Sequence, residues 1–263
     1  MEKESPQKEG LVGIFDILGY QYIIDNNQIN DVANIISNIL LPLPEKATDK
    51  FLSGIKDEVI ADAYSSAIRR GALKWRIFSD TILLSYPFTH KELPKFASII
   101  DYLFFLNHVS YLLRCAFDAG LPLRGAIDYG DFYIKENCFA GKPIINSYRL
   151  SQELQISGCA MTDSLQKQYF ADIESDKVFK KAKFIFVRPY LVPLKENNTK
   201  RLCLIDWLSP FTDSEIPPDL RQYVAEKFYA HNKDIPREAS SKLENTEMTL
   251  RYFLSKREEA DRP

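Results

Sequence analysis

The chain has 263 residues, of which 45% are hydrophobic and 27% are charged, and its formal net charge is −2. This composition is typical of a globular protein with a substantial core, and the charge balance argues against a general nucleic-acid binder, which would carry a basic excess. No run of about 18 apolar residues and no apolar leader is present, so we expect no membrane partner and a cytoplasmic location. Widely spaced cysteines and isolated histidines argue against a zinc site, a disulfide framework and a histidine-based triad.

The first predicted strand ends in an aspartate. Residues 1–9 are polar and predict a flexible N-terminus, and the apolar run 10–16 predicts a strand whose last residue is Asp16. Apolar residues then recur at helical spacing over 22–41, and Pro42 and Pro44 are expected to end that helix. A second helix is expected at 58–69.

A second aspartate lies in the turn between two further predicted strands. Residues 73–79 and 81–87 predict a tight hairpin around Asp80, and a long helix is expected over 93–118. Glycines 125 and 130 predict a strand, a bend and a return strand within 121–134. The later expectations are a helix at 143–155, a strand at 159–162, a helix at 163–170, a hairpin of 183–195 with 201–207, and charged helices over 217–258.

The order of these elements through residue 134 predicts an α/β fold with a ferredoxin-like βαββαβ core. In that order the first and second strands run in the same direction, and the third strand returns between them. The end of the first strand and the turn after the second therefore lie at one edge of the sheet. We expect Asp16 and Asp80 to meet there.

Two carboxylates at one sheet edge suggest a divalent metal site. A carboxylate in an apolar strand costs several kcal/mol unless a metal or an ion pair compensates it. Hard oxygen ligands suit Mg²⁺ or Mn²⁺, and such a pair can hold two ions that activate a hydroxyl and neutralise a triphosphate. The amides of residues 17–20 turn into the next helix, which favours phosphate. The plainer alternative makes Asp16 a helix N-cap and Asp80 a turn residue.

Four motifs resemble the catalytic domain of class III nucleotide cyclases over roughly residues 10–205. They are Phe15-Asp16-Ile17-Leu18-Gly19-Tyr20, Phe78-Ser79-Asp80, Leu123-Arg124-Gly125-Ala126-Ile127 with Gly130, and Gly141 with Arg149-Leu150. The resemblance implies a cyclase-type ferredoxin-like core with extra helices as a catalytic domain over 10–210. Residues 211–263 are then a charged helical C-terminal extension, and its mixed charge favours a solvated face.

The resemblance also implies roles for individual residues. The metal-binding residues would be Asp16, Ile17 and Asp80, and Arg149 would stabilise the transition state. The triphosphate would contact Leu18, Gly19, Tyr20 and Lys195, and the base would contact Arg76 and Cys138. Plainer readings stay open: Arg149 a solvated helix residue, Lys195 an exposed lysine, Arg76 a paired surface residue and Cys138 a small filler. The role of Arg124 is undecided.

Two departures from the family pattern concern the substrate. The family's asparagine, four residues before the arginine, falls on Ile145, and Asn146 lies one position later. At the base-selecting positions, Arg76 with Cys138 matches neither the adenylate nor the guanylate combination of the family. Arginine only donates hydrogen bonds, which suits the carbonyl acceptors of uracil and could also serve the acceptor face of guanine.

The long insertion between the first two strands, the absence of sensor domains and the charged tail resemble the bacterial Pycsar pyrimidine cyclases, which act in antiphage defence. The resemblance implies a homodimer with interfacial sites that converts UTP, or next CTP, to a cyclic monophosphate read by a downstream effector. The alternatives are an ordinary adenylate or guanylate cyclase, and a non-catalytic module that binds a nucleotide or a partner. A diguanylate-cyclase or polymerase-palm relative is a further rival, but residues 78–82 lack a Gly-Gly-Asp-Glu-Phe turn.

Overall fold

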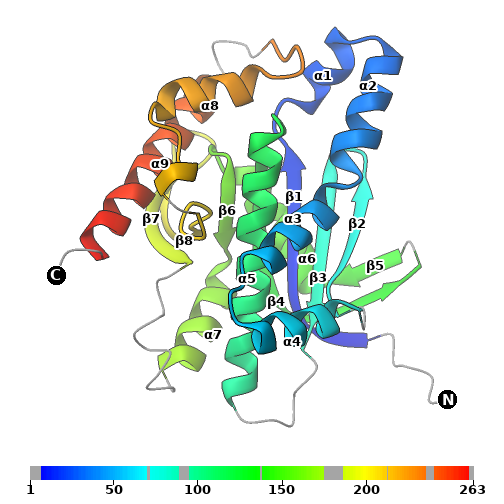
Figure 1. The fold of residues 1–263 in the computed structure, drawn as a ribbon, viewed down its shortest axis with the longest axis vertical. Helices are drawn as coiled ribbons and strands as arrows, with labels where there is room; N and C mark the ends of the chain where they lie inside the picture. The colour runs from blue at the N-terminus through cyan, green and yellow to red at the C-terminus, as the bar shows by residue number, and fades with distance from the viewer. Residues whose placement is uncertain are drawn as a thin grey trace.

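Figure 1 shows the computed structural model of the chain, which describes residues 7–69, 72–88, 95–136, 138–174, 186–211, 213–234 and 240–260. The strands are β1 (Gln7–Ile17), β2 (Lys74–Phe78), β3 (Thr81–Pro87), β4 (Leu123–Lys135), β5 (Cys138–Gly141), β6 (Gly158–Met161), β7 (Val187–Pro193) and β8 (Thr199–Ile205). The helices are α1 (Tyr20–Asn26), α2 (Ile29–Ile35), the π-helical η1 (Ile36–Leu40), α3 (Leu43–Ser53), α4 (Glu58–Arg69), α5 (Lys95–Asp118), α6 (Lys142–Glu153), α7 (Asp163–Glu174), the 3₁₀ turn η3 (Asp213–Glu215), α8 (Leu220–Tyr229) and α9 (Ser240–Ala260). None of these described helices is long and apolar enough to cross a membrane.

The described strands form one sheet in the order β2-β3-β1-β4-β6-β8-β7, and β5 pairs with the end of β4. The β4–β6 pair is parallel, and the other strand pairs are antiparallel. Strand β3 lies between β1 and β2, so β1 and β2 point the same way. The α/β class and the ferredoxin-like order predicted for the first part of the chain are confirmed.

Different helices pack on the two faces of the sheet (Figure 1). Alternate residues of β1 show this, because Phe15 and Ile17 belong to the main core while Val12 and Ile14 pack with Ile144 of α6. Helices α3, α5 and α7 cover the main-core face, and α6 crosses β1 and β4 on the other. Asp16 shares the α6 face with Val12 and Ile14 by the same alternation.

Helices α8 and α9 are part of the main core. Val224, Phe228, Leu250 and Phe253 are each at most 2% exposed and belong to the same hydrophobic cluster as β1. The helical character predicted for residues 217–258 is confirmed where α8 and α9 lie, and residues 235–239 of the prediction lie outside the described residues. The interpretation as a solvated face is wrong, because both helices pack onto the main core.

Several predicted element boundaries are wrong. Strand β1 begins at Gln7, so residues 7–9 of the predicted flexible N-terminus are ordered, whereas 1–6 lie outside the described residues. The helix predicted over 22–41 divides into α1, α2 and η1. The helical run ends at Leu40, with Leu41 as its C-cap directly before Pro42, as predicted. Pro42 and Pro44 also stand at the start of α3, where proline lacks only an N–H that the first turn does not use.

Strand β4 is continuous over Leu123–Lys135, so the predicted division into two strands at the glycines is wrong. Gly125 is needed for close packing, since an added Cβ would lie 2.2 Å from Cδ1 of Phe15 on the neighbouring strand. Gly130 pairs directly with Gly10 of β1, so the ladder continues through it. The return strand is β5, eight residues further along the chain than Gly130. The hairpin of β7 and β8 is present, and residues 183–185 of its prediction lie outside the described residues.

Candidate active site

Asp16 and Asp80 meet at the sheet edge where the strand order places them. The amide of Ile17 donates a hydrogen bond to the backbone carbonyl of Asp80 at 3.1 Å, which joins the end of β1 to the β2–β3 turn. Burial raises the pKa of Asp16 above its ordinary value, Arg124 opposes the rise, and the negative charge of Asp80 adds to it. The two carboxylates are therefore close enough to repel each other.

Arg124 is the direct partner of Asp16. Its Nη2 lies 2.9 Å from Oδ2 of Asp16 and its Nε lies 3.3 Å from Oδ1, in a two-pronged ion pair whose side chains are 9% and 13% exposed. The guanidinium also donates to the side-chain oxygen of Gln152 and to the backbone carbonyls of Gln152 and Leu154. An ion pair thus compensates the buried Asp16, which was one of the two possibilities that the sequence left open.

The side chains at this edge offer the type of oxygen ligand that Mg²⁺ and Mn²⁺ prefer. Asp16 and Asp80 provide hard oxygen atoms, and their mutual repulsion would be relieved by a shared cation. Within the described residues, no group of three or more His, Cys, Asp or Glu side chains could hold a metal. The protein would therefore supply two carboxylates and a backbone oxygen such as that of Ile17, and a bound ion would compete with Arg124 for Asp16.

The loop after β1 is tied to the protein at its first two amides. The amide of Ile17 is used by Asp80, and the amide of Leu18 donates to the carbonyl of Pro122 at 2.9 Å. Gly19 caps α1 with φ 77°, a left-handed conformation that favours glycine. Burial raises the pKa of Tyr20, the charge of Asp80 raises it further, and a hydrogen bond with the Ser79 side chain opposes the rise.

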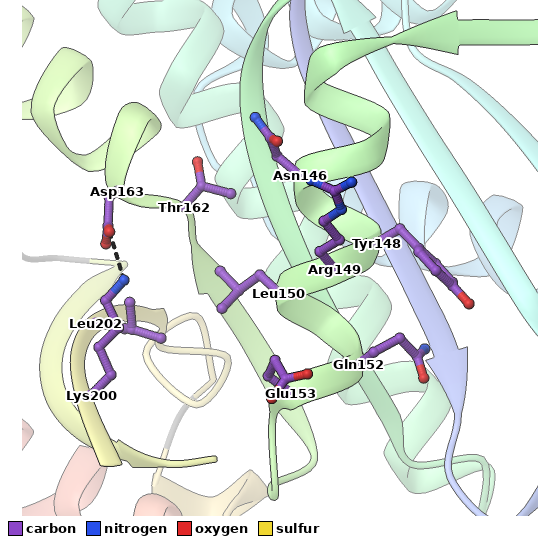
Figure 2. A pocket seen from close by; sticks show the side chains of 10 residues that line it. All are labelled: Asn146, Tyr148, Arg149, Leu150, Gln152, Glu153, Thr162, Asp163, Lys200 and Leu202. Carbon is purple, nitrogen blue, oxygen red and sulfur yellow. Dashed lines mark hydrogen bonds and ion pairs between the residues drawn. The ribbon is translucent and has the colours of Figure 1, made fainter. Parts of the chain in front are cut away.

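Helix α6 forms one wall of an open pocket of about 520 Å³ (Figure 2). Arg149 and Asn146 line it side by side, whereas Ile145 is 50% exposed and does not contribute to the lining. Asn146, and not Ile145, therefore lines the pocket together with Arg149. Neither Asp16 nor Asp80 lines this pocket, although Gln152 lines it and also donates to Asp16 at 3.3 Å.

The two predicted base-reading residues lie close to one another on outer strands. Arg76 of β2 donates from Nη1 to the carbonyl of Trp75 at 2.9 Å, and its Nε lies 3.5 Å from the carbonyl of Glu136. Cys138, which opens β5, follows Glu136 by two residues, and both Arg76 and Cys138 are exposed. Arg76 lies two residues before the end of β2, and Asp80 lies in the turn that follows this strand.

Two lysines lie near the carboxylate edge. Lys195 is exposed at the β7–β8 turn, and its amide donates to the carbonyl of Glu153 at 2.9 Å. Lys242 of α9 was not predicted. Burial lowers its pKa, Arg124 and Lys195 lower it further, and Asp16 opposes them, so these charges share one region. No motif in the sequence connects α9 with Asp16.

Sequence reasoning also missed Asp128 of β4. Its side chain is 1% exposed and accepts hydrogen bonds from Asn146 and from the hydroxyls of Thr162 and Ser164. Asp128 falls inside the Leu123–Gly130 motif at a position to which the resemblance gives no role. An acidic residue among apolar strand residues was the available signal, the same one that singled out Asp16.

No protein-family model matches the sequence, and no curated protein matches it. Among solved structures, the chain is similar to the guanylate cyclase domain of RhGC from Catenaria anguillulae in complex with GTP, at 13% identity, with 76% of this chain and 97% of that chain covered and a TM-score of 0.44. It is also similar to the adenylyl cyclase CyaB from P. aeruginosa, at 12% identity, 76% and 94% coverage and a TM-score of 0.45. The monomeric guanylyl cyclase domain of RhoGC from Blastocladiella emersonii gives 13% identity, 76% and 95% coverage and a TM-score of 0.45.

Proposed function

We propose that the protein is a metal-dependent nucleotide cyclase that converts a pyrimidine nucleoside triphosphate, UTP before CTP, to its 3′,5′-cyclic monophosphate and pyrophosphate. The observation that carries the proposal is the meeting of Asp16 and Asp80 at one sheet edge, joined by the Ile17–Asp80 hydrogen bond of 3.1 Å. The four cyclase-like motifs and the shared pocket of Arg149 with Asn146 support it.

Asp16, Asp80 and the carbonyl of Ile17 would hold two Mg²⁺ or Mn²⁺ ions, which neutralise the triphosphate and lower the pKa of the ribose 3′-hydroxyl. The 3′-hydroxyl would give its proton to solvent water as its oxygen forms a bond to the α-phosphorus, while the bond from that phosphorus to the pyrophosphate oxygen breaks and pyrophosphate leaves. Arg149 stabilises the negative charge that develops on the α-phosphate. The loop of Leu18, Gly19 and Tyr20 binds the phosphates, mainly through Gly19 and Tyr20, because the Leu18 amide already serves Pro122.

The active enzyme in this proposal is a homodimer with two equivalent interfacial sites. Support comes from the separation of Asp16 and Asp80 from the pocket of Arg149 within one subunit. Large apolar side chains are also exposed around α6 and β2: Phe78 by 79%, Tyr148 by 54% and Ile145 by 50%. A second copy facing this surface would bury them and would bring the aspartates of one subunit toward the arginine of the other.

Arg76 and Cys138 read the base in this proposal. Arg76 is exposed, and among the described residues only two carbonyl partners engage its five N–H donors. Donors without acceptors suit the carbonyl oxygens of uracil. Lys195 contributes positive charge for the triphosphate. The cyclic product would act in the cytoplasm as a messenger for a downstream effector in antiphage defence.

One observation favours a second candidate, a cyclase-like module that binds a nucleotide or a partner without turning it over. Asp16 is already neutralised by Arg124 at 2.9 Å, so the carboxylate does not require a metal for its stability. A module of this kind would bind nucleoside triphosphates but release no pyrophosphate. An ordinary purine cyclase would instead release pyrophosphate from ATP or GTP.

The experiment that tests catalysis at the aspartate pair uses Asp16→Asn and Asp80→Asn, with Asp31→Asn on the exposed surface of α2 as the matched control. We expect each site variant to lose at least about 100-fold in turnover, because metal stabilisation of the transition state is worth several kcal/mol. Circular dichroism should show an intact fold, and the control should keep its rate. Full activity in both site variants would overturn the proposed function.

A further inference from the structure

Asp128 is a buried carboxylate that the proposed mechanism does not use. It is 1% exposed, and in the described part of the chain no basic side chain forms an ion pair with it. Its partners are neutral: Ser164 donates to Oδ1 at 2.7 Å, Thr162 donates to the same oxygen, and Asn146 donates to Oδ2 at 2.8 Å. A charge held by three neutral donors fixes the orientation of each of them.

The hydrogen bonds of Thr162 show that its proton is committed to Asp128. Its hydroxyl donates to Asp128, because a carboxylate only accepts, while Oγ1 accepts from the amide of Leu165 at 3.2 Å and lies 3.0 Å from Oγ of Ser164. Asp128 therefore acts as the acceptor for the whole group. The remaining partner, Asn146, must present a donor to it.

The orientation of the Asn146 amide follows from this arrangement. A carboxylate only accepts, so the NH₂ group of Asn146 faces Asp128 and its carbonyl oxygen Oδ1 is left for other partners. Asn146 is exposed at the pocket wall beside Thr162 and Arg149 (Figure 2). Without Asp128, the amide could exchange its nitrogen and oxygen by a half turn. With Asp128, the pocket receives a fixed acceptor.

We propose that Asp128 is a positioning residue, which orients Asn146 so that Oδ1 accepts a hydrogen bond from a ribose hydroxyl of the nucleoside triphosphate. This inference rests on the proposed function. Asn146 and Arg149 are three residues apart on α6, which places them about 4.5 Å apart along the helix axis. If Arg149 contacts the α-phosphate, the nucleotide donors within reach of Asn146 are the 2′- and 3′-hydroxyls of the ribose.

The test compares binding of three ligands that cannot release pyrophosphate: the α,β-methylene analogues of UTP, 2′-deoxy-UTP and 3′-deoxy-UTP. Isothermal titration calorimetry with Mn²⁺ gives the ratio of affinities for the ribo and deoxy forms. We expect the wild-type protein to prefer the ribo form over at least one deoxy form by about tenfold, as one neutral hydrogen bond allows. Asp128→Asn should reduce the ratio to about one, because an amide at position 128 can face Asn146 with either end.

Three further variants make the test specific. Asp31→Asn makes the same chemical change on the exposed surface of α2, outside the pocket, so it should keep the wild-type ratio. The exchange Asp128→Asn with Asn146→Asp puts an acceptor back in the pocket and should restore the ratio. Asn146→Ala alters an exposed residue and carries the test if Asp128→Asn fails to fold.

A loss of protein stability alone does not change the ratio of the affinities for the ribo and deoxy analogues. Retention of the wild-type ratio in folded Asp128→Asn, or in Asn146→Ala, would overturn the inference while the proposed function stands. Wild-type protein that binds the three analogues equally would also overturn it. Wild-type protein that binds none of them would overturn the proposed function and the inference together.

Discussion

Among the single side chains of the site, Arg124 has the largest effect on Asp16. Arg124→Met would leave a buried carboxylate without its ionic partner, so we expect the free energy of unfolding to fall by about 3–5 kcal/mol in a urea titration. Arg251→Met is the matched control, because Arg251 is 60% exposed in its 2.8 Å pair with Glu247. The control should change by at most about 1 kcal/mol. Equal losses of unfolding free energy in both variants would show that the Arg124–Asp16 pair stabilises the protein no more than an exposed pair does.

Asp16 and Asp80 could be found from the sequence because each lies in an apolar context and the strand order brings them together. The pairing of Asp16 with Arg124 could not, because it depends on the register of β1 with β4. A shift of one residue would place Arg124 on the opposite face of the sheet. The contact of Asp128 with Asn146 depends likewise on how α6 lies across β4.

At the scale of elements, α5 carries a buried histidine that should make the protein acid-sensitive. Burial lowers the pKa of His108 to about 3, and within the described residues its Nε2 has no hydrogen-bond partner. The unfolded chain binds a proton near its ordinary pKa of 6.5, whereas the folded chain does not. Stability should therefore fall as the pH drops from 6.5 toward 3, by up to about 1.4 kcal/mol per pH unit.

Urea titrations at pH 7.5 and pH 5 measure this effect. His108→Leu removes the titrating group from the same buried position, so the variant should lose less stability than the wild-type protein between the two pH values. An equal loss in both proteins would assign the acid sensitivity to other groups. The comparison uses the difference between pH values, so a general change in packing does not affect it.

The elements predicted best are those with strong local signals. Helix α4 has the predicted bounds, and β2 and β3 differ from their predictions by at most one residue at either end. The glycines of β4 led to a wrong prediction of two strands. Gly125 is required because Phe15 packs against it, which is a matter of tertiary packing that the local sequence does not show. The helix predicted over 22–41 divides because apolar spacing alone does not mark the break at Asn27.

At the scale of the whole molecule, the C-terminal extension stabilises the domain. Leu250 is fully buried in the main core, whereas Met248 on the same helix is 60% exposed. Leu250→Ala should cost about 2–5 kcal/mol of unfolding free energy, and Met248→Ala should change it by at most about 0.5 kcal/mol. Thermal and urea unfolding measure both. Equal small effects would mean that α9 does not belong to the folded core.

The burial of one face of α9 could not be predicted from the sequence, because the helix is rich in charged and polar residues. Its buried residues are Thr246, Thr249, Leu250 and Phe253, which follow the i, i+3, i+4, i+7 spacing of a buried helical face. Two of the four are threonines, so the hydrophobic pattern is weak beside the surrounding charges. The Thr246 hydroxyl accepts from the Ser157 amide at 2.8 Å, a tertiary contact that compensates its burial.

Incubation of the purified protein with Mn²⁺ and ATP, GTP, CTP or UTP, in separate reactions, would show whether it is a cyclase and which base it prefers. Mass spectrometry would detect a cyclic monophosphate, and a coupled assay would measure pyrophosphate. We expect cyclic UMP with one pyrophosphate per product, less cyclic CMP, and no product from Asp16→Asn. Absence of product from all four nucleotides, or product from ATP or GTP alone, would contradict the proposed function.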